Sequence, residues 1–229
     1  MKRVLAPGWN AVVANWRPLV AIQFVCLLLV VGYYTLTPIQ NACAVLAKWK
    51  ADGGVMFAAL SVAIAAAILP EIARRITKVP RDKPLTIGDV TFQFAYFAVL
   101  GIAIDFLYRG LGILLGDSPT PIVVIEKVLC DMIGFSGFFS MPLAVVLFSW
   151  RDADFKFAGV PPLLKNGGFL ERYIPLLITC WAFWFPVMAC LYSLPVNLQF
   201  VFVVLAEAAW CLLLVTAASR TPEIDKTIA

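Results

Sequence analysis

Six ionisable side chains interrupt long apolar segments of this sequence: Asp105, Arg109, Glu126, Lys127, Asp131 and Glu207. Each would lie within a membrane if those segments are transmembrane helices. An ionised group at the bilayer centre costs about 2.5–3.5 kcal/mol on insertion scales, so we expect these groups to pair inside a helix bundle or to meet water there. They are therefore the candidate residues of a polar pathway or of an intramembrane charge network.

The spacing of these residues predicts ion pairs. Lys127 and Asp131 are four residues apart, which makes them neighbours on one helix face, and Asp105 and Arg109 have the same spacing. Only the short stretch GDSPT separates the two apolar segments, so we expect an antiparallel hairpin in which the charges form one cluster at similar depth. Two alternatives stay open: a buried salt-bridge network that fixes the register of the hairpin, or a partly hydrated pathway.

Glu207 differs because no charged residue lies near it on its own helix. Its neighbours at three and four residues are Val203, Val204, Trp210 and Cys211, none of which we expect to pair with it. The sequence therefore predicts a partner on another helix, contact with water, or a protonated carboxyl group.

Composition indicates that the elements carrying these residues are membrane helices. Hydrophobic residues make up 62% of the chain and charged residues 14%, and the mean hydropathy is +0.91. A soluble core of this size could not bury so much apolar surface, and a bilayer core requires about 20 mostly apolar residues per helix. We predict an all-α fold, a polytopic membrane helix bundle of about six transmembrane helices, at residues 19–37, 54–70, 90–115, 121–149, 174–195 and 198–219.

The distribution of basic residues predicts the orientation of the bundle. With six spans, only Lys48 and Lys50 lie on one side, and Arg109 and Lys127 lie within spans. The positive-inside rule then places both termini on the same cytoplasmic or matrix-like side. That side holds 14 of the 18 Lys and Arg residues: Lys2, Arg3, Arg17, Arg74, Arg75, Lys78, Arg81, Lys83, Arg151, Lys156, Lys165, Arg172, Arg220 and Lys226.

Several classes of function are disfavoured. The predicted loops are too short for a soluble catalytic domain, and the chain has no His, the commonest metal ligand and the usual base near neutral pH. The six Cys residues are scattered without CxxC spacing and favour neither a metal site nor a disulfide framework. We expect no enzyme activity, catalytic residue, metal or cofactor, and no nucleic-acid partner. The acid-free, basic amino terminus fits either a mitochondrial presequence or an inside-facing terminus.

The charged hairpin resembles a known family. EKVLCDMIGFSGFF, DFLYRGLGILLG, LITCWAFWFP and LYSLPVNLQFVFVVLAEAAW are similar to the motifs of the Mpv-seventeen, or twenty-two-kilodalton peroxisomal membrane protein, family over roughly residues 49–218. Departures are Met132 and Gln199, where the family usually has Gln and Arg, Phe185 between Trp184 and Pro186, and the stretch LPEIARR. Besides Arg109, Lys127 and Asp131, the matched residues are Tyr108, Phe135, Trp184, Pro186, Tyr192, Pro195 and Trp210.

The resemblance implies a domain organisation and a function. Residues 1–48 would be a basic amino terminus with an extra first transmembrane helix, 49–219 the family-like bundle, and 220–229 a polar tail. The resemblance implies a small-solute channel or carrier of the mitochondrial inner membrane, with a peroxisomal or bacterial inner membrane as the alternatives. The alternative is a non-catalytic accessory subunit of a larger membrane complex. Expected partners are membrane lipid and either further copies of the chain or such a complex.

Overall fold

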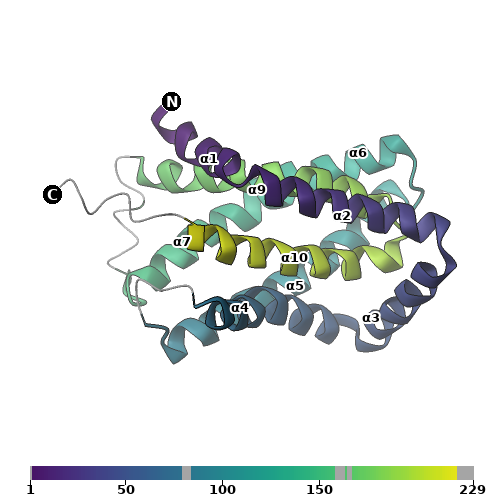
Figure 1. Ribbon diagram of the computed structural model, residues 1–229, viewed down its shortest axis with the longest axis horizontal. Helices are drawn as coiled ribbons and strands as arrows, with labels where there is room; N and C mark the ends of the chain where they lie inside the picture. The colour runs from purple at the N-terminus through teal and green to yellow at the C-terminus, as the bar shows by residue number, and fades with distance from the viewer. Residues whose placement is uncertain (1, 79–83, 158–162, 164–166, 221–229) are drawn as a thin grey trace.

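The computed structural model describes residues 2–78, 84–157, 163 and 167–220 of the chain, and every regular element in those residues is helical (Figure 1). The predicted all-α class is therefore confirmed. In chain order the elements are α1 (Lys2–Ala14), α2 (Trp16–Thr35), α3 (Thr37–Ala63), the π-helix η1 (Ile64–Ile68), α4 (Leu69–Thr77), α5 (Ile87–Leu115), α6 (Pro121–Leu129), the π-helix η2 (Cys130–Ser140), α7 (Met141–Asp152), α9 (Gly168–Tyr192) and α10 (Val196–Arg220).

Five helical segments are long and apolar enough to cross a membrane. They are Trp16–Thr35, Thr37–Thr77, Ile87–Leu115, Pro121–Asp152 and Gly168–Tyr192. The last predicted span, 198–219, coincides with α10, whose described apolar stretch, Val196–Leu212, is shorter than those five. Outward-facing side chains on these helices include Ile113, 85% exposed, and Phe138, 80% exposed. Such apolar surface suits lipid rather than water.

The second predicted span, 54–70, belongs to a helix that begins earlier than the sequence predicted. The segment that carries Lys48 and Lys50 was expected to be a loop, but it belongs to α3, which starts at Thr37 with Pro38 in its first turn, where proline is tolerated. The expected boundary between residues 48 and 49 falls inside this helix. Gly54, with φ of 53°, kinks α3, because glycine adopts this left-handed conformation at little steric cost. A straight helix of this length would overrun the bilayer, and the kink lets it turn.

Each π-helical segment ends two residues before a proline. Pro70 is the second residue of α4, after η1, and Pro142 is the second residue of α7, after η2. Proline has no N–H to donate and its ring clashes with the carbonyl four residues earlier, so the preceding turn widens to the π pattern. The wide turns of η2, before Pro142, carry Asp131.

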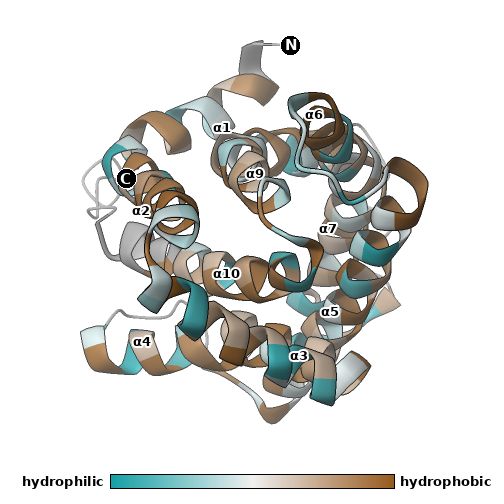
Figure 2. Ribbon diagram, turned by 90° about the vertical axis from the view of Figure 1, so that its right-hand side faces the viewer, coloured by the Kyte–Doolittle hydropathy of each residue, from teal (hydrophilic) through white to brown (hydrophobic). Residues whose placement is uncertain are grey.

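Helix α10 lies at the centre of the bundle, between the α2 and α9 pair on one side and α3, α4 and α5 on the other (Figures 1 and 2). Helices α3 and α5 pack especially closely, because Gly101 lets the backbone of α5 approach the carbonyl of Ala58. Across the other interface, Gln23 of α2 donates to the carbonyl oxygen of Ala182 in α9 at 2.8 Å. These contacts hold four long helices around α10.

The predicted turns are confirmed at two places. Helix α5 ends at Leu115 and α6 begins at Pro121, and α9 ends at Tyr192 before α10 begins at Val196. The start of α1 and the end of α10 lie at the same end of the bundle, together with the starts of α5 and α9 (Figure 1). Arg172 joins α9 to α7 there by donating to Ser149 Oγ at 2.8 Å. Of the basic residues assigned to this side, Arg81, Lys83, Lys165 and Lys226 lie outside the described residues.

Candidate functional site

A cavity of about 80 Å³ lies between α5, η2, α9 and α10, and we refer to it as the carboxyl cavity. Two carboxyl groups line it, Asp131 from η2 and Glu207 from α10. No Lys or Arg lines it among the residues that the structure describes. The remaining lining is mainly apolar and aromatic, including Tyr108 and Trp184. The space is large enough for a few water molecules, so a small polar species can enter it.

Asp131 is buried, with 4% of its surface exposed. Its carboxylate accepts a hydrogen bond of 2.7 Å from the phenol of Tyr192, a residue of α9. The predicted pair with Lys127 is wrong, because Lys127 Nζ instead lies 3.9 Å from Asp117 Oδ1 in the turn before α6. Only one oxygen of Asp131 has this partner, so the second can meet whatever occupies the cavity.

Glu207 also differs from its prediction. The thiol of Cys211, one turn further along α10, lies 3.5 Å from Glu207 Oε1 and donates to it. The prediction that Cys211 does not pair with Glu207 is therefore wrong, because a thiol is a weak donor. Glu207 is nevertheless without an ion pair among the described residues. Its carboxyl group therefore depends on the cavity for any stronger interaction.

Side chains of α9 hold the wide turns of η2 in place. Trp181 Nε1 donates to the carbonyl oxygen of Met132 at 3.0 Å, and the phenol of Tyr173 donates to that of Gly137 at 2.7 Å. A π-helix places its backbone bonds less favourably than an α-helix, so these external donors support it. Ser136 lies 3.6 Å from the Cys180 sulfur, oxygen to sulfur. Together these contacts fix Asp131 toward the cavity side of η2.

Asp105 belongs to a second group of charges, outside the carboxyl cavity. Its ion pair with Arg109, predicted from their spacing, is confirmed. Lys50 joins the same carboxylate from α3, with Nζ 2.9 Å from Asp105 Oδ1. The ammonium also donates to the carbonyl oxygen of Gly54 at the kink and lies 5.0 Å from the ring centre of Phe200.

The predicted single cluster is thus divided into separate groups. Asp105 and Arg109 interact with Lys50, Lys127 approaches Asp117, and the carboxyl groups of the cavity stand apart from both. Glu126 is exposed on the outer face of α6 and has no ion pair among the described residues. The structure therefore assigns two of the six candidate residues, Asp131 and Glu207, to one cavity.

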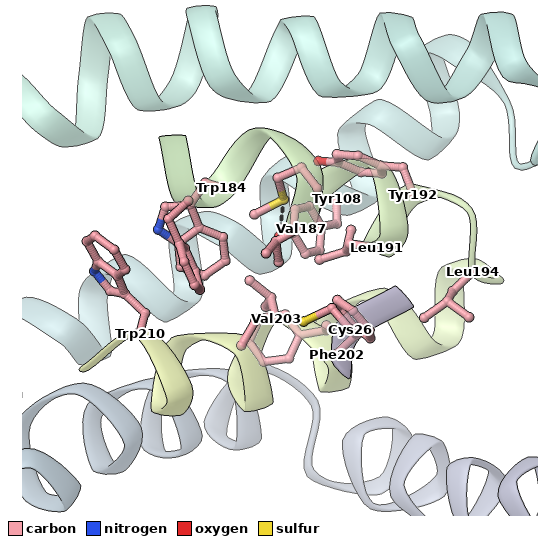
Figure 3. Packing of buried hydrophobic residues seen from close by; sticks show 14 of the residues in the cluster. Cys26, Tyr108, Trp184, Val187, Leu191, Tyr192, Leu194, Phe202, Val203 and Trp210 are labelled. Atoms are coloured by element: carbon pink, nitrogen blue, oxygen red, sulfur yellow. Dashed lines mark hydrogen bonds between the residues drawn. The ribbon is translucent and has the colours of Figure 1, made fainter. Parts of the chain in front are cut away.

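Four of the motif residues pack in the hydrophobic core: Tyr108, Trp184, Tyr192 and Trp210 (Figure 3). Tyr108 donates to Met188 Sδ at 3.8 Å and its ring meets that of Tyr192 edge to face, 5.6 Å between centroids. Trp210 packs on Phe183 at 4.6 Å between centroids. Trp184 is buried beside the cavity. Phe135 lies partly buried on the cavity, Pro186 is exposed within α9, and Pro195 lies in the turn before α10.

The sequence pointed to neither Lys50 nor Ser140. Lys50 was assigned to a loop, and no pattern drew attention to Ser140, which is 5% exposed and lines the cavity. Within the described residues, no three His, Cys, Asp or Glu side chains gather in a way that could hold a metal ion. Comparison of the chain with protein-family models, curated protein sequences and solved structures finds no match.

Proposed function

We propose that this protein is a multi-pass membrane channel or carrier for small solutes and that the carboxyl cavity lies on the solute path. The observation that carries the proposal is the presence of Asp131 and Glu207 on one cavity inside an apolar helix bundle. Ionisable groups at membrane depth are costly and most often mark a substrate or ion path. The family resemblance of the hairpin and of α9 and α10 points to the same kind of function.

The proposal includes an orientation and a membrane. Six spans with both termini on the cytoplasmic or matrix-like side agree with the distribution of Lys and Arg. The mitochondrial inner membrane is the first expectation, with the peroxisomal membrane or a bacterial inner membrane as alternatives. Neither expectation is needed for the chemistry of the cavity.

A flux measurement tests this proposal. The purified chain is reconstituted in liposomes, and release of a panel of labelled small ions, organic acids and sugars is followed. We expect flux of at least one solute class above protein-free liposomes. Glu207→Gln keeps the shape of the side chain and removes its charge, so it should change selectivity or rate. Glu126→Gln is the matched control, because that carboxyl group is exposed on the outer face. Wild-type protein that is folded and incorporated but passes no solute would contradict the proposal.

The second candidate is an accessory subunit of a larger membrane complex. The outward apolar surface that includes Ile113 and Phe138 could be covered by protein as well as by lipid. Native electrophoresis in mild detergent separates the two candidates. Constant migration with a large complex favours the accessory role, and migration as a small homo-oligomer favours transport.

A further inference from the structure

We propose that the carboxyl cavity binds a small monovalent cation in exchange for a proton, with the carboxylate of Asp131 as the charged ligand. This inference rests on the proposed function, because it names the solute class for the same site. It is carried by three features of the cavity: its charge, an unused hydroxyl group and its size.

The lining of the cavity is acidic, so a cation or protons must balance its negative charge. Among the described residues, the titratable side chains that face the cavity or interact with its carboxyl groups are Tyr96 and Tyr108 from α5, Asp131 from η2, Cys180 and Tyr192 from α9, and Glu207 and Cys211 from α10. All of them are acids and none is a base. Three described ammonium and guanidinium groups are used elsewhere, since Lys50 and Arg109 pair with Asp105 and Lys127 approaches Asp117.

Ser140 supplies an independent sign of a ligand. The residue is 5% exposed and lines the cavity, and its hydroxyl group has no hydrogen-bond partner among the described residues. Buried hydroxyl groups in proteins nearly always have a partner. Serine in a helix usually bonds back to a carbonyl, as Ser149 does to Val145 at 2.6 Å. Ser140 is thus free to donate to or ligate a bound species.

The ligand atoms and the volume favour a monovalent ion. Hydroxyl and carboxylate oxygens suit hard cations. Mg²⁺ keeps several waters when bound and Ca²⁺ takes six to eight oxygens, whereas a cavity of about 80 Å³ has room for an ion with only a few waters. Trp184 also lines the cavity, and aromatic rings can attract cations.

The two carboxyl groups have different roles in the exchange. Asp131 accepts from the phenol of Tyr192, whereas Glu207 has only the weaker thiol donor of Cys211, so Asp131 is the better-supported carboxylate. The exchange that we propose starts from the protonated form of both groups. When a cation enters, the Asp131 proton passes to water and leaves, the carboxylate binds the cation, and Glu207 keeps its proton. One positive charge enters as one leaves, so the cavity never holds an uncompensated charge.

Proton release on cation binding tests this inference without any flux. The full chain in detergent and weak buffer is titrated with NaCl or KCl at constant ionic strength set by choline chloride, and a pH indicator reports released protons. We expect about one proton per chain at saturation with Na⁺ or K⁺. Asp131→Asn should abolish the release, Ser140→Ala should weaken the apparent cation affinity several-fold, and Glu126→Gln should behave as wild type. Circular dichroism checks that each variant is folded.

The outcomes separate this inference from the proposed function. No release with Na⁺ or K⁺ from folded wild type, release with Ca²⁺ alone, or undiminished release from Asp131→Asn would each overturn the exchange. Solute flux in liposomes without cation-linked proton release would leave the transport function standing and remove the cation. If folding is lost in Asp131→Asn, Asp131→Glu keeps a carboxyl group on a longer side chain and should retain release with a changed affinity.

Discussion

The Lys50 ammonium lies 2.9 Å from a carboxylate oxygen of Asp105 and thereby joins α3 to α5. Both side chains are largely buried, with 12% and 5% of their surfaces exposed, whereas the Arg109 side chain on the same carboxylate is 51% exposed. Asp105 is therefore the centre of this group of charges, and its two partners differ in how strongly they depend on it.

Removing Asp105 should cost more than removing either partner. Asp105→Asn leaves the buried Lys50 ammonium unpaired, and breaking a buried pair in this way costs about 3–5 kcal/mol. Arg109→Gln removes an exposed charge and should cost about 0–1 kcal/mol. Unfolding of each variant in detergent measures these differences. In the Asp105→Asn background, Lys50→Met should recover part of the loss. Strictly additive effects would show that the two side chains are not coupled.

The hydrogen bond between Tyr192 and Asp131 gives a second prediction. Tyr192→Phe keeps the ring packed on Tyr108 and removes the only described donor to the buried carboxyl group. It should lower the free energy of unfolding by about 1–3 kcal/mol.

The effects of Lys127→Met and Asp131→Asn on the free energy of unfolding should be additive, because Lys127 approaches Asp117 instead. A large coupling between Lys127 and Asp131 would restore the pairing expected from their spacing.

These two relationships show what local sequence patterns can and cannot predict. The turns at residues 116–120 and 193–195 follow from proline, glycine and polar residues, which act locally. The partner of Asp131 could not be predicted in this way. Spacing of four residues assumes an α-helix, but Asp131 lies in the π-helix η2, where five-residue hydrogen bonding changes which side chains share a face.

Long-range contacts were the other source of error. Lys50 lies outside the predicted span 54–70, because an apolar window that begins at Gly54 ignores the polar first half of α3. Its partner Asp105 lies in α5, which is separated from α3 in the chain by η1 and α4, and no pattern in a single sequence reveals that contact. The carboxyl cavity likewise depends on how α10 enters the bundle, so Asp131 and Glu207 could be selected separately but not placed together.

Close packing of α3 on α5 predicts a strong effect at Gly101. A Cβ atom there would overlap the carbonyl oxygen of Ala58 and would lie 3.0 Å from Val62 Cβ. Gly101→Ala should therefore destabilise the bundle by roughly 1–3 kcal/mol through overpacking. Gly110→Ala, in the same helix, is the control, because nothing lies within 4 Å of its added carbon. Equal thermal stability of the two variants in detergent would show that α3 and α5 pack less closely than described.

The orientation of the bundle predicts how single cysteines react. Ser118 lies in the turn between α5 and α6, and Lys156 follows α7 at the other end of the segment Pro121–Asp152. Both are exposed. In a Cys-free background, Ser118→Cys and Lys156→Cys should be labelled by an impermeant maleimide from opposite sides of sealed vesicles. Labelling of both from one side would show that this segment does not cross the membrane.

Filling the carboxyl cavity tests the central claim, that solute passes through it, most directly. Val203 is 3% exposed and lines the cavity from α10, whereas Leu205 is 52% exposed and does not line the cavity. Val203→Phe and Leu205→Phe therefore add an aromatic ring to the same helix in opposite directions. The measurement is solute flux in liposomes at matched incorporation, with folding of each variant checked in detergent. The account predicts that Val203→Phe lowers flux at least tenfold while Leu205→Phe retains it. Wild-type flux through folded Val203→Phe would contradict it.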